Sequence, residues 1–381
     1  MRRALVLFVA VLLPTAYVAW PRPARSHETL TTTVLFDREI VRILDSRCVM
    51  CHAADGPSFP LESYEQTWLR RRSMHDEVIA RHMPPWSAVP GYGHFANDNS
   101  LTLRETQFIV SWVEGLGPRN GGTVFTNTVE PGDRPVEIRA RYLHAGHWHL
   151  GEPSLVRAIP AVRVEPKQPA HVRRLVVDPG LTTAQHIRAV EYIPGDRRVV
   201  RAAFFTIEET GQWIGSWTPW YGYMQLPEGV AYTLPARSHI IAEIHYRGAD
   251  TAVVDEGRLG LSFAEGSALR TVSDIVLNAA RAGGAGRLRA DVRLAADTHV
   301  VALRPEMSGD ITSIEVSARR PDGGTDILLF ARDFDENWPT PYVLREPVLL
   351  RRGTLLMVTA YSEAAAPDGR VRMTVSGYPA P

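Results

Sequence analysis

This sequence contains little cysteine and has no formal net charge. Its 381 residues include only two cysteines, Cys48 and Cys51, so a network of structural disulfides is excluded. Basic and acidic side chains balance at 42 each. This balance argues against nucleic-acid binding, because proteins that bind nucleic acids carry a basic face or stripe. The fold must therefore be stabilised by a hydrophobic core or by a bound cofactor.

The N-terminus has the pattern of an export signal. Arg2 and Arg3 precede an apolar run that ends at Trp20, and this order is typical of a secretory segment. We expect residues 1–25 to be a signal peptide or, because no small-x-small cleavage site stands out, an uncleaved membrane anchor. The protein is therefore predicted to be exported, in the periplasm or another extracytoplasmic compartment.

Both cysteines belong to the segment Cys48-Val49-Met50-Cys51-His52. Two thiols three residues apart on one helical turn can both reach the vinyl groups of a haem, and the next histidine can ligate the iron. A thioredoxin-like pair does not need this histidine, and a zinc site would need further ligands where no other cysteine exists. The sequence therefore predicts one covalent haem c, attached to Cys48 and Cys51, with His52 as the proximal ligand.

The sixth iron ligand is predicted to be Met83. It is followed by two prolines that end a helix and keep the next segment extended. A thioether ligand raises the reduction potential and suits an electron carrier. The rival ligands are Met74, His75 and His82, and the alternative role for Met83 is that of a core residue beneath the haem.

Helical periodicity continues through residues 30–118, which are predicted to form a small helical cytochrome c domain. One helix over Phe36 to Asp45 leads into the haem motif, a second covers about residues 64–81, and a third about 102–114. Thr102 and Glu105 form a predicted capping box at the start of the third helix. Residues 119–149 are expected to be a linker.

Short alternating strands with turn residues between them begin near residue 150 and predict β-sandwiches. Examples of such strands lie at 198–207, 238–246, 313–317 and 353–361. The length favours two sandwiches, over residues 150–270 and 271–381. The expected fold is thus multidomain α plus all-β, a helical cytochrome c domain followed by two antiparallel jelly-roll-like β-sandwiches.

Several short motifs follow one another in a distinctive order. They are Met83-Pro-Pro-Trp, Gly93-His-Phe-Ala-Asn-Asp98, Trp112-Val-Glu-Gly, Leu150-Gly-Glu-Pro153, Glu191-Tyr-Ile-Pro-Gly195 with Arg198-Val-Val, Leu226-Pro-Glu-Gly-Val230, His245-Tyr246 and Asp333-Phe-Asp-Glu-Asn-Trp338. In this order the chain resembles a bacterial cytochrome c fused to a domain pair of the copper type II, ascorbate-dependent monooxygenases. That family includes peptidylglycine hydroxylase and dopamine β-hydroxylase.

The resemblance implies two copper sites, but most of the family's ligands are missing here. The His-His pair after the Arg-Val-Val strand is replaced by Arg201-Ala202, and the His-x-His of the second sandwich by residues 305–308. His245 remains, while Met357 and Met373 lie in no recognisable ligand context. Because copper is held by imidazole far better than by Arg, Ala or Ser, we do not expect tight copper binding.

Two further groups of side chains are candidates for function. His144, His147 and His149 precede the first sandwich, and a His-x-His pair on a strand would suit weak metal binding, as would His245. The alternative is a solvated linker in which Trp148 packs on the sandwich. The aromatic residues Trp213, Trp217, Trp220, Tyr221 and Tyr223 are predicted to form the interface between the cytochrome and the sandwich.

The sequence therefore predicts an exported mono-haem cytochrome that transfers electrons. Its sandwich pair would be a scaffold or a docking module for a redox protein or a larger membrane-associated assembly. The alternative is a copper-dependent monooxygenase that hydroxylates a C–H bond with electrons supplied through the haem. A third hypothesis is a binding module that recognises a subunit or a glycan.

Overall fold

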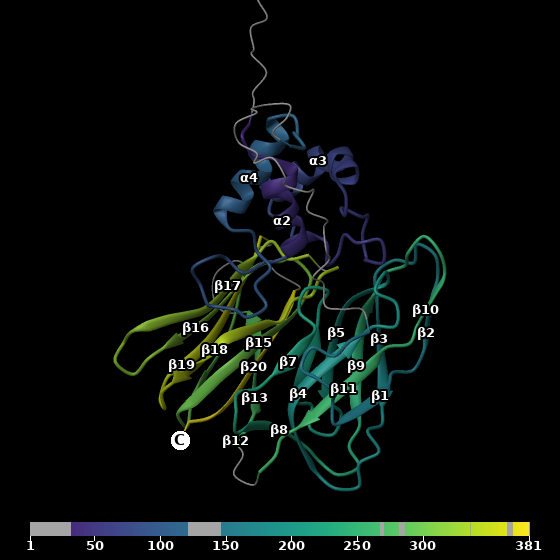
Figure 1. Ribbon diagram of the computed structural model, residues 1–381. Coiled ribbons are helices and arrows are strands. Elements are labelled where there is room, and N and C mark those ends of the chain that lie inside the picture. Colours follow the sequence, from purple (N-terminus) through teal and green to yellow (C-terminus); the bar gives the residue numbers. More distant parts are fainter. Residues whose placement is uncertain are drawn as a thin grey trace, which may run out of the picture.

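The computed structural model describes residues 32–120, 146–266, 270–281, 286–335, 337–363 and 369–380. The predicted signal or anchor, residues 1–25, and His144 lie outside these ranges. Strands dominate the described residues, and the fold is mainly β-sandwich, as the sequence predicts (Figure 1). None of the helices in the described ranges has the length and apolar character needed to span a bilayer.

A helical region precedes the strands. One continuous helix is formed by η1 (Phe36–Ile40), α2 (Val41–Ile43) and η2 (Leu44–Cys48), and it ends at the first cysteine. Two more helices follow, α3 (Tyr64–Ile79) and α4 (Leu103–Glu114). The predicted capping box of α4, formed by Thr102 and Glu105, is confirmed. The helix α3 ends two residues earlier than predicted, because Arg81 adopts a left-handed backbone with φ 59°.

This region has its own hydrophobic core, in which α2, α3 and α4 meet around Ile40, Leu44, Val78, Ile109 and Trp112. The amide of Val49 donates to the carbonyl of Leu44, 2.9 Å away. This is an i to i−5 bond, and such π-type turns are frequent at functional sites.

The first sandwich packs two sheets face to face. One sheet has the order β1-β11-β4-β8-β12 with β7 beside β4, the other has the order β3-β9-β5-β6, and β2 pairs with β10 in a separate ribbon. The strands are β1 (Leu155–Ala158), β2 (Val162–Val164), β3 (His171–Val177), β4 (Gln185–Ile193), β5 (Val200–Ile207), β6 (Trp213–Trp217), β7 (Tyr223–Gln225), β8 (Val230–Leu234), β9 (Ile240–Tyr246), β10 (Val253–Asp255), β11 (Arg258–Phe263) and β12 (Arg270–Thr271).

The second sandwich is one sheet of eight strands in the order β17-β16-β19-β14-β13-β20-β15-β18. Only two residue pairs join β13 to β14, and the two halves of the sheet enclose one shared core. The strands are β13 (Ser273–Arg281), β14 (Arg287–Arg293), β15 (Thr298–Ser308), β16 (Ile311–Arg319), β17 (Thr325–Arg332), β18 (Tyr342–Leu350), β19 (Leu355–Ser362) and β20 (Arg370–Pro379).

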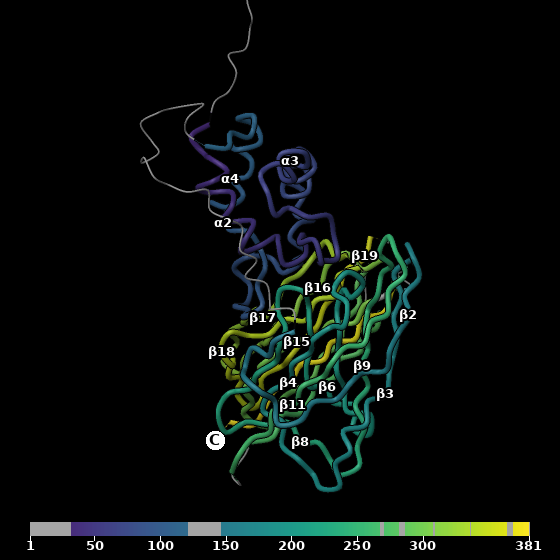
Figure 2. Tube along the Cα trace, turned by 45° about the vertical axis from the view of Figure 1, so that its right-hand side comes forward, coloured from purple at the N-terminus to yellow at the C-terminus, as the bar shows by residue number. Residues whose placement is uncertain are grey.

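The two sandwiches pack side by side and share apolar contacts (Figures 1 and 2). Val301, Ala302, Val343 and Tyr378 of the second sandwich belong to the hydrophobic core of the first. The chain crosses from one sandwich to the other between β12, which pairs with β8, and β13. A continuous core fixes the orientation of one sandwich relative to the other.

The helical region lies across one end of both sandwiches (Figure 1). Its segment 87–97 contacts the second sandwich, where Ala88 bridges Ala331 of β17 and Phe95 bridges Leu344 of β18. These are the two outermost strands of the eight-stranded sheet. Between the two bridges, Gly93 has φ +80°, and a Cβ there would lie 2.5 Å from the carbonyl oxygen of Leu328. Glycine is therefore required for this close approach.

Candidate functional site

His52 is oriented by its own loop. Its Nδ1 lies 2.8 Å from the carbonyl oxygen of Phe59, so this nitrogen carries the proton and donates it. The ring is 9% exposed, and burial lowers the pKa of the imidazole, although the bond to Phe59 opposes the shift. A neutral ring with Nδ1–H bonded to a carbonyl leaves Nε2 as a lone-pair donor. Metal-binding histidines are oriented in this way.

The two cysteines lie at the end of the first helix and in the turn that follows it. Both are free thiols, and the amides of Cys51 and His52 donate to the carbonyl of Cys48 at 3.0 and 2.9 Å. Burial raises the pKa of each thiol to about 12, and for Cys51 the nearby charges of Arg197 and Arg201 oppose that rise. The donor set of two adjacent thiols and an oriented imidazole fits a covalently attached haem.

Two arginines of the first sandwich contact the attachment segment. Arg197 donates from Nη2 to the carbonyl of Met50 at 2.7 Å, and its Nη1 lies 3.5 Å from Asp55. Arg201, on β5, donates to the carbonyl of Pro57 at 3.0 Å. Both guanidinium groups are buried. The first sandwich therefore places two positive charges against the segment that carries the cysteines.

Met83 follows α3 and lines a cavity of about 620 Å³ together with Trp86, Phe334 and Trp338. His52 is not among the residues that line this cavity, so Met83 as the sixth ligand stays a prediction. Two of its rivals have acidic neighbours. His75 lies 2.9 Å from the carboxylate of Asp76, and the exposed His82 lies 3.0 Å from that of Glu77.

The third rival, Met74, packs against the core of the helical region.

Arg201, His245 and residues 305–307, where the resemblance implies copper ligands, line a cleft between the sandwiches together with Arg304. Arg201 and His245 come from β5 and β9, and Arg304 comes from β15. The Nε2 of His245 lies 3.4 Å from Glu243, and the same carboxylate accepts from Arg304 at 2.9 Å. Guanidinium groups are poor ligands for copper, and the absence of tight copper binding stays a prediction.

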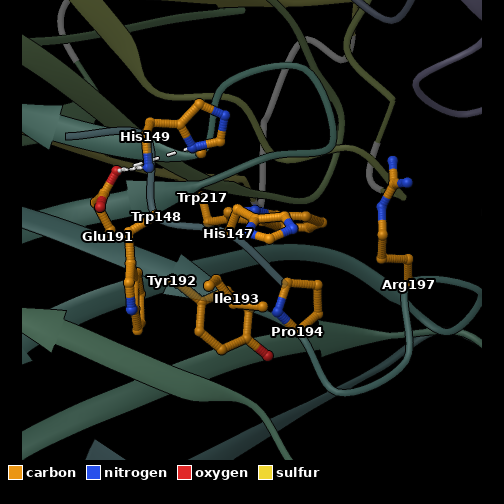
Figure 3. Close-up of a pocket in the computed structure, with 10 residues that line it drawn as sticks. His147, Trp148, His149, Glu191, Tyr192, Ile193, Pro194, Arg197 and Trp217 are labelled. Atoms are coloured by element: carbon orange, nitrogen blue, oxygen red, sulfur yellow. Dashed lines mark hydrogen bonds and ion pairs between the residues drawn. The ribbon is translucent and has the colours of Figure 1, made fainter. Parts of the chain in front are cut away.

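Within the described part of the chain, His147 and His149 belong to no close group of three potential metal ligands. His147 lies in an irregular loop and His149 in a turn, and neither is on a strand, so the expected alignment of their rings is wrong. The amide of His149 donates to Glu191 at 2.9 Å, and its Nδ1 lies 3.8 Å from the same carboxylate. Figure 3 shows the His149 ring, and not the His147 ring, against Glu191.

Among the described residues, one group of three potential metal ligands lies close together, formed by Glu208, Glu209 and His239. It contains none of the predicted ligands.

Glu191, beside His149, is buried. Burial raises the pKa of its carboxyl, although hydrogen bonds from the backbone amides of Leu150 and His149 lower that pKa in part.

The aromatic residues 213–223 do not form the predicted interface with the helical region. Trp213 and Trp217, on β6, are buried in the core of the first sandwich. Trp220 lies 6.3 Å, between ring centroids, from Trp338 of the second sandwich. Because β6 lies at the edge of a packed sheet, its alternate positions point into the sandwich, and apolar burial decides where these rings lie.

The arginines are the residues that the sequence analysis missed. Nothing in the sequence marked Arg197 as a functional residue. Arg201 occupies, and Arg304 precedes, a position where the resemblance implies a histidine that this chain lacks. Their function depends on contacts between segments that are distant in the sequence, such as Arg201 with Pro57. The one available sequence signal was that Arg201 and Arg304 each interrupt an otherwise apolar stretch of a strand.

No protein-family model and no curated protein matches this chain. Among solved structures, the major capsid protein P2 of bacteriophage PM2 is similar over 58% of this chain and 98% of its own, at 7% identity and a TM-score of 0.27. A Paenibacillus xanthan lyase is similar over 59% of this chain and 25% of its own, at 10% identity and a TM-score of 0.20. Allantoicase is similar over 53% and 76%, at 12% identity and a TM-score of 0.20. Similarity this low carries no argument about function.

Proposed function

We propose that the protein is an exported mono-haem c-type cytochrome that transfers single electrons. The observation that carries this proposal is the bond from Nδ1 of His52 to the carbonyl of Phe59, next to two free thiols. It leaves Nε2 available as an iron ligand in the motif where haem c is attached. Haem c, when attached, supplies a reversible one-electron iron couple.

Each residue of the site has a defined role in this proposal. Cys48 and Cys51 form the thioether bonds, and His52 is the proximal ligand, kept in one tautomer by Phe59. Met83 is the proposed sixth ligand. Val49 of the motif is buried in the core around α2, α3 and α4, and a methionine as second axial ligand would leave no open position on the iron for a small molecule.

We propose that the sandwich pair is a scaffold related to the copper type II monooxygenases that does not bind copper. Support comes from the cleft, where Arg201, Arg304 and His245, which is hydrogen-bonded to Glu243, lie at or beside the family's ligand positions. The pair would orient the helical region and provide a surface for a redox partner. Export is supported by the N-terminal sequence alone.

Haem attachment tests the proposal most directly. The full chain would be produced in a host that matures c-type cytochromes, and covalent haem would be measured by pyridine haemochrome and by haem staining after denaturing electrophoresis. We expect one haem and one iron per chain, with no copper. The double variant C48A/C51A should lose the haem, and the matched control Met50→Ala should keep it. Two coppers per chain, or full haem staining of the double variant, would show that the proposal is wrong.

The sixth ligand needs a separate measurement. Met83→Ala should abolish the weak near-infrared band that a thioether-to-iron bond gives in the oxidised protein. His82→Ala, a change at the exposed neighbouring residue, should leave the band in place. If the band persists in Met83→Ala, the ligand is another residue, and the proposal for Met83 alone fails.

A further inference from the structure

A cleft of about 630 Å³ separates the two sandwiches where the helical region meets them. Strands β3, β5 and β9 of the first sandwich line one side, and β15 with residues 334, 335 and 337–340 of the second lines the other. Ser87 of the helical region completes the wall. The size lies within the range that small organic ligands occupy in proteins.

The carboxylates of this cleft have cationic or amide partners. Glu243 accepts from Arg304 at 2.9 Å. Glu306 lies 3.7 Å from Arg304 and 3.6 Å from Arg372. Asp335, which is exposed, accepts from the amide groups of Asn337. Arg304 is thus balanced by two acids, although its buried Nε has no hydrogen-bond partner in the described structure.

Arg201 differs from every other charged group in the cleft. It is 7% exposed, and its guanidinium donates only to the carbonyls of Arg198 and Pro57. Among the described residues, no carboxylate lies within 4 Å of it. Burial lowers the pKa of Arg201 to about 10, so the group is still a cation at neutral pH. A buried cation without an anion is costly, and a bound anion would remove that cost.

One aromatic ring lies beside each of the two cleft arginines. The guanidinium of Arg201 lies 5.1 Å from the ring centroid of Trp338, and that of Arg304 lies 4.2 Å from the ring of Phe204. Both rings line the cleft. Trp338 provides flat apolar surface beside the unpaired charge, and Phe204 provides it beside Arg304. Flat rings pack well against other planar groups.

We propose that the cleft binds a small aromatic carboxylate. Arg201 would pair with the carboxylate, and Trp338 and Phe204 would contact the ring. This function goes beyond electron transfer, and it does not require that the haem proposal be correct. The geometry of a guanidinium favours a carboxylate, because its parallel N–H groups can bind both oxygens.

A haem propionate is the other source of a carboxylate. A haem joined through its vinyl groups to Cys48 and Cys51 has its propionates on the opposite edge of the ring. Arg201 lies on the side of Cys51, whose thiol its charge influences, and it is bonded to Pro57 of the same loop. This placement favours a separate ligand.

Calorimetric titration of the full-length, haem-loaded protein tests the proposal, with benzoate as the probe and benzamide as its neutral isostere. We expect saturable binding of benzoate and at least roughly tenfold weaker binding of benzamide, because a charge-assisted hydrogen bond is lost. This arm needs no variant. Equal binding of benzoate and benzamide would overturn the proposal. Absence of benzoate binding would also overturn it, and that result is expected if a haem propionate occupies Arg201.

Variants locate the site. Arg201→Gln should weaken benzoate binding by roughly tenfold or more, and Arg201→Lys should lose less. The matched control is Arg197→Gln, because Arg197 also donates to the attachment segment but does not line the cleft. Its affinity should stay within about twofold of the wild type. Unchanged affinity in Arg201→Gln, with a circular dichroism spectrum like that of the wild type, would show that the site is elsewhere.

Discussion

The helical region contacts the two sandwiches with opposite chemistry. Against the second sandwich the contact is neutral, with Asn97 bonded to the carbonyl of Pro341 and the amide of Val343 at 2.6 and 3.0 Å. Phe95 and Trp86 pack on Tyr342 at 5.2 and 5.3 Å between ring centroids. Against the first sandwich the contact is made by the buried guanidinium groups of Arg197 and Arg201 on backbone carbonyls.

This difference separates two tasks. Aromatic packing and amide bonds depend little on pH or salt, so the neutral contact is suited to fixing the helical region in place. The guanidinium groups lie against the segment 48–57, so their positive charge would act on any group attached to Cys48 and Cys51. The first contact is therefore expected to govern stability, and the second to govern electrostatics at the proposed haem.

The largest expected effect comes from breaking the neutral contact. Phe95→Ala removes a side chain that is 3% exposed and packs on Trp86 and Tyr342. We expect a loss of about 3–5 kcal/mol in the free energy of unfolding, because a buried ring leaves a cavity. Urea unfolding followed by fluorescence measures this change. The control is Tyr92→Ala, an exposed ring on the same segment, and equal losses in both variants would contradict the assignment.

A smaller effect is expected at the charged contact. Arg197→Gln removes a positive charge near Cys51 and, if haem is attached as proposed, stabilises the oxidised iron. At an effective dielectric constant near 20 the change is on the order of 1 kcal/mol, or about 40 mV for a one-electron couple. Spectroelectrochemistry should show a lower reduction potential. Arg198→Gln, at an exposed neighbour paired with Asp196, serves as the control, and an equal shift there would refute the distinction.

The smallest effect concerns the turn that presents Arg197. Asp255 accepts from the amide of Asp196 and from the hydroxyl of Tyr246, both at 2.8 Å. Burial raises the pKa of this carboxyl despite those bonds. A raised pKa in the folded state means that the contribution to stability is fully present below the unfolded pKa and is lost as pH rises through the folded one.

Between pH 7 and pH 4 the wild type should therefore gain stability relative to Asp255→Asn. Thermal unfolding across that range measures the difference. Asp250→Asn, at an exposed position, should show no such gain. A difference that shrinks as the pH falls would have the wrong sign and would show that the carboxylate form is the stabilising one.

Local patterns in the sequence predicted local structure well. The helical periodicity of residues 64–81 and 102–114 and the strands at 198–207 and 238–246 correspond to α3, α4, β5 and β9. These elements follow from the spacing of apolar residues and from capping side chains such as Thr102, which act within a few residues.

Contacts between distant segments could not be predicted in this way. Arg201 meets Pro57 across 144 positions of the chain, and nothing in either local sequence indicates the partner. The sequence around Trp217 would look the same if this residue lay at an interface or in a core. Only the packing of the sheets places it in the core. The histidines at 147 and 149 failed as a predicted pair because a turn replaces the strand that would have aligned them.

The bridges of segment 87–97 also bear on solubility. The strands β17 and β18 are the two open edges of the eight-stranded sheet, and Ala88 and Phe95 cover part of each. Uncovered edges offer unpaired backbone groups to other chains and promote edge-to-edge aggregation. A fragment that contained only the two sandwiches would expose both edges together with the Tyr342 ring. The segment 87–97 therefore covers backbone edges that would otherwise be open to pairing with another chain.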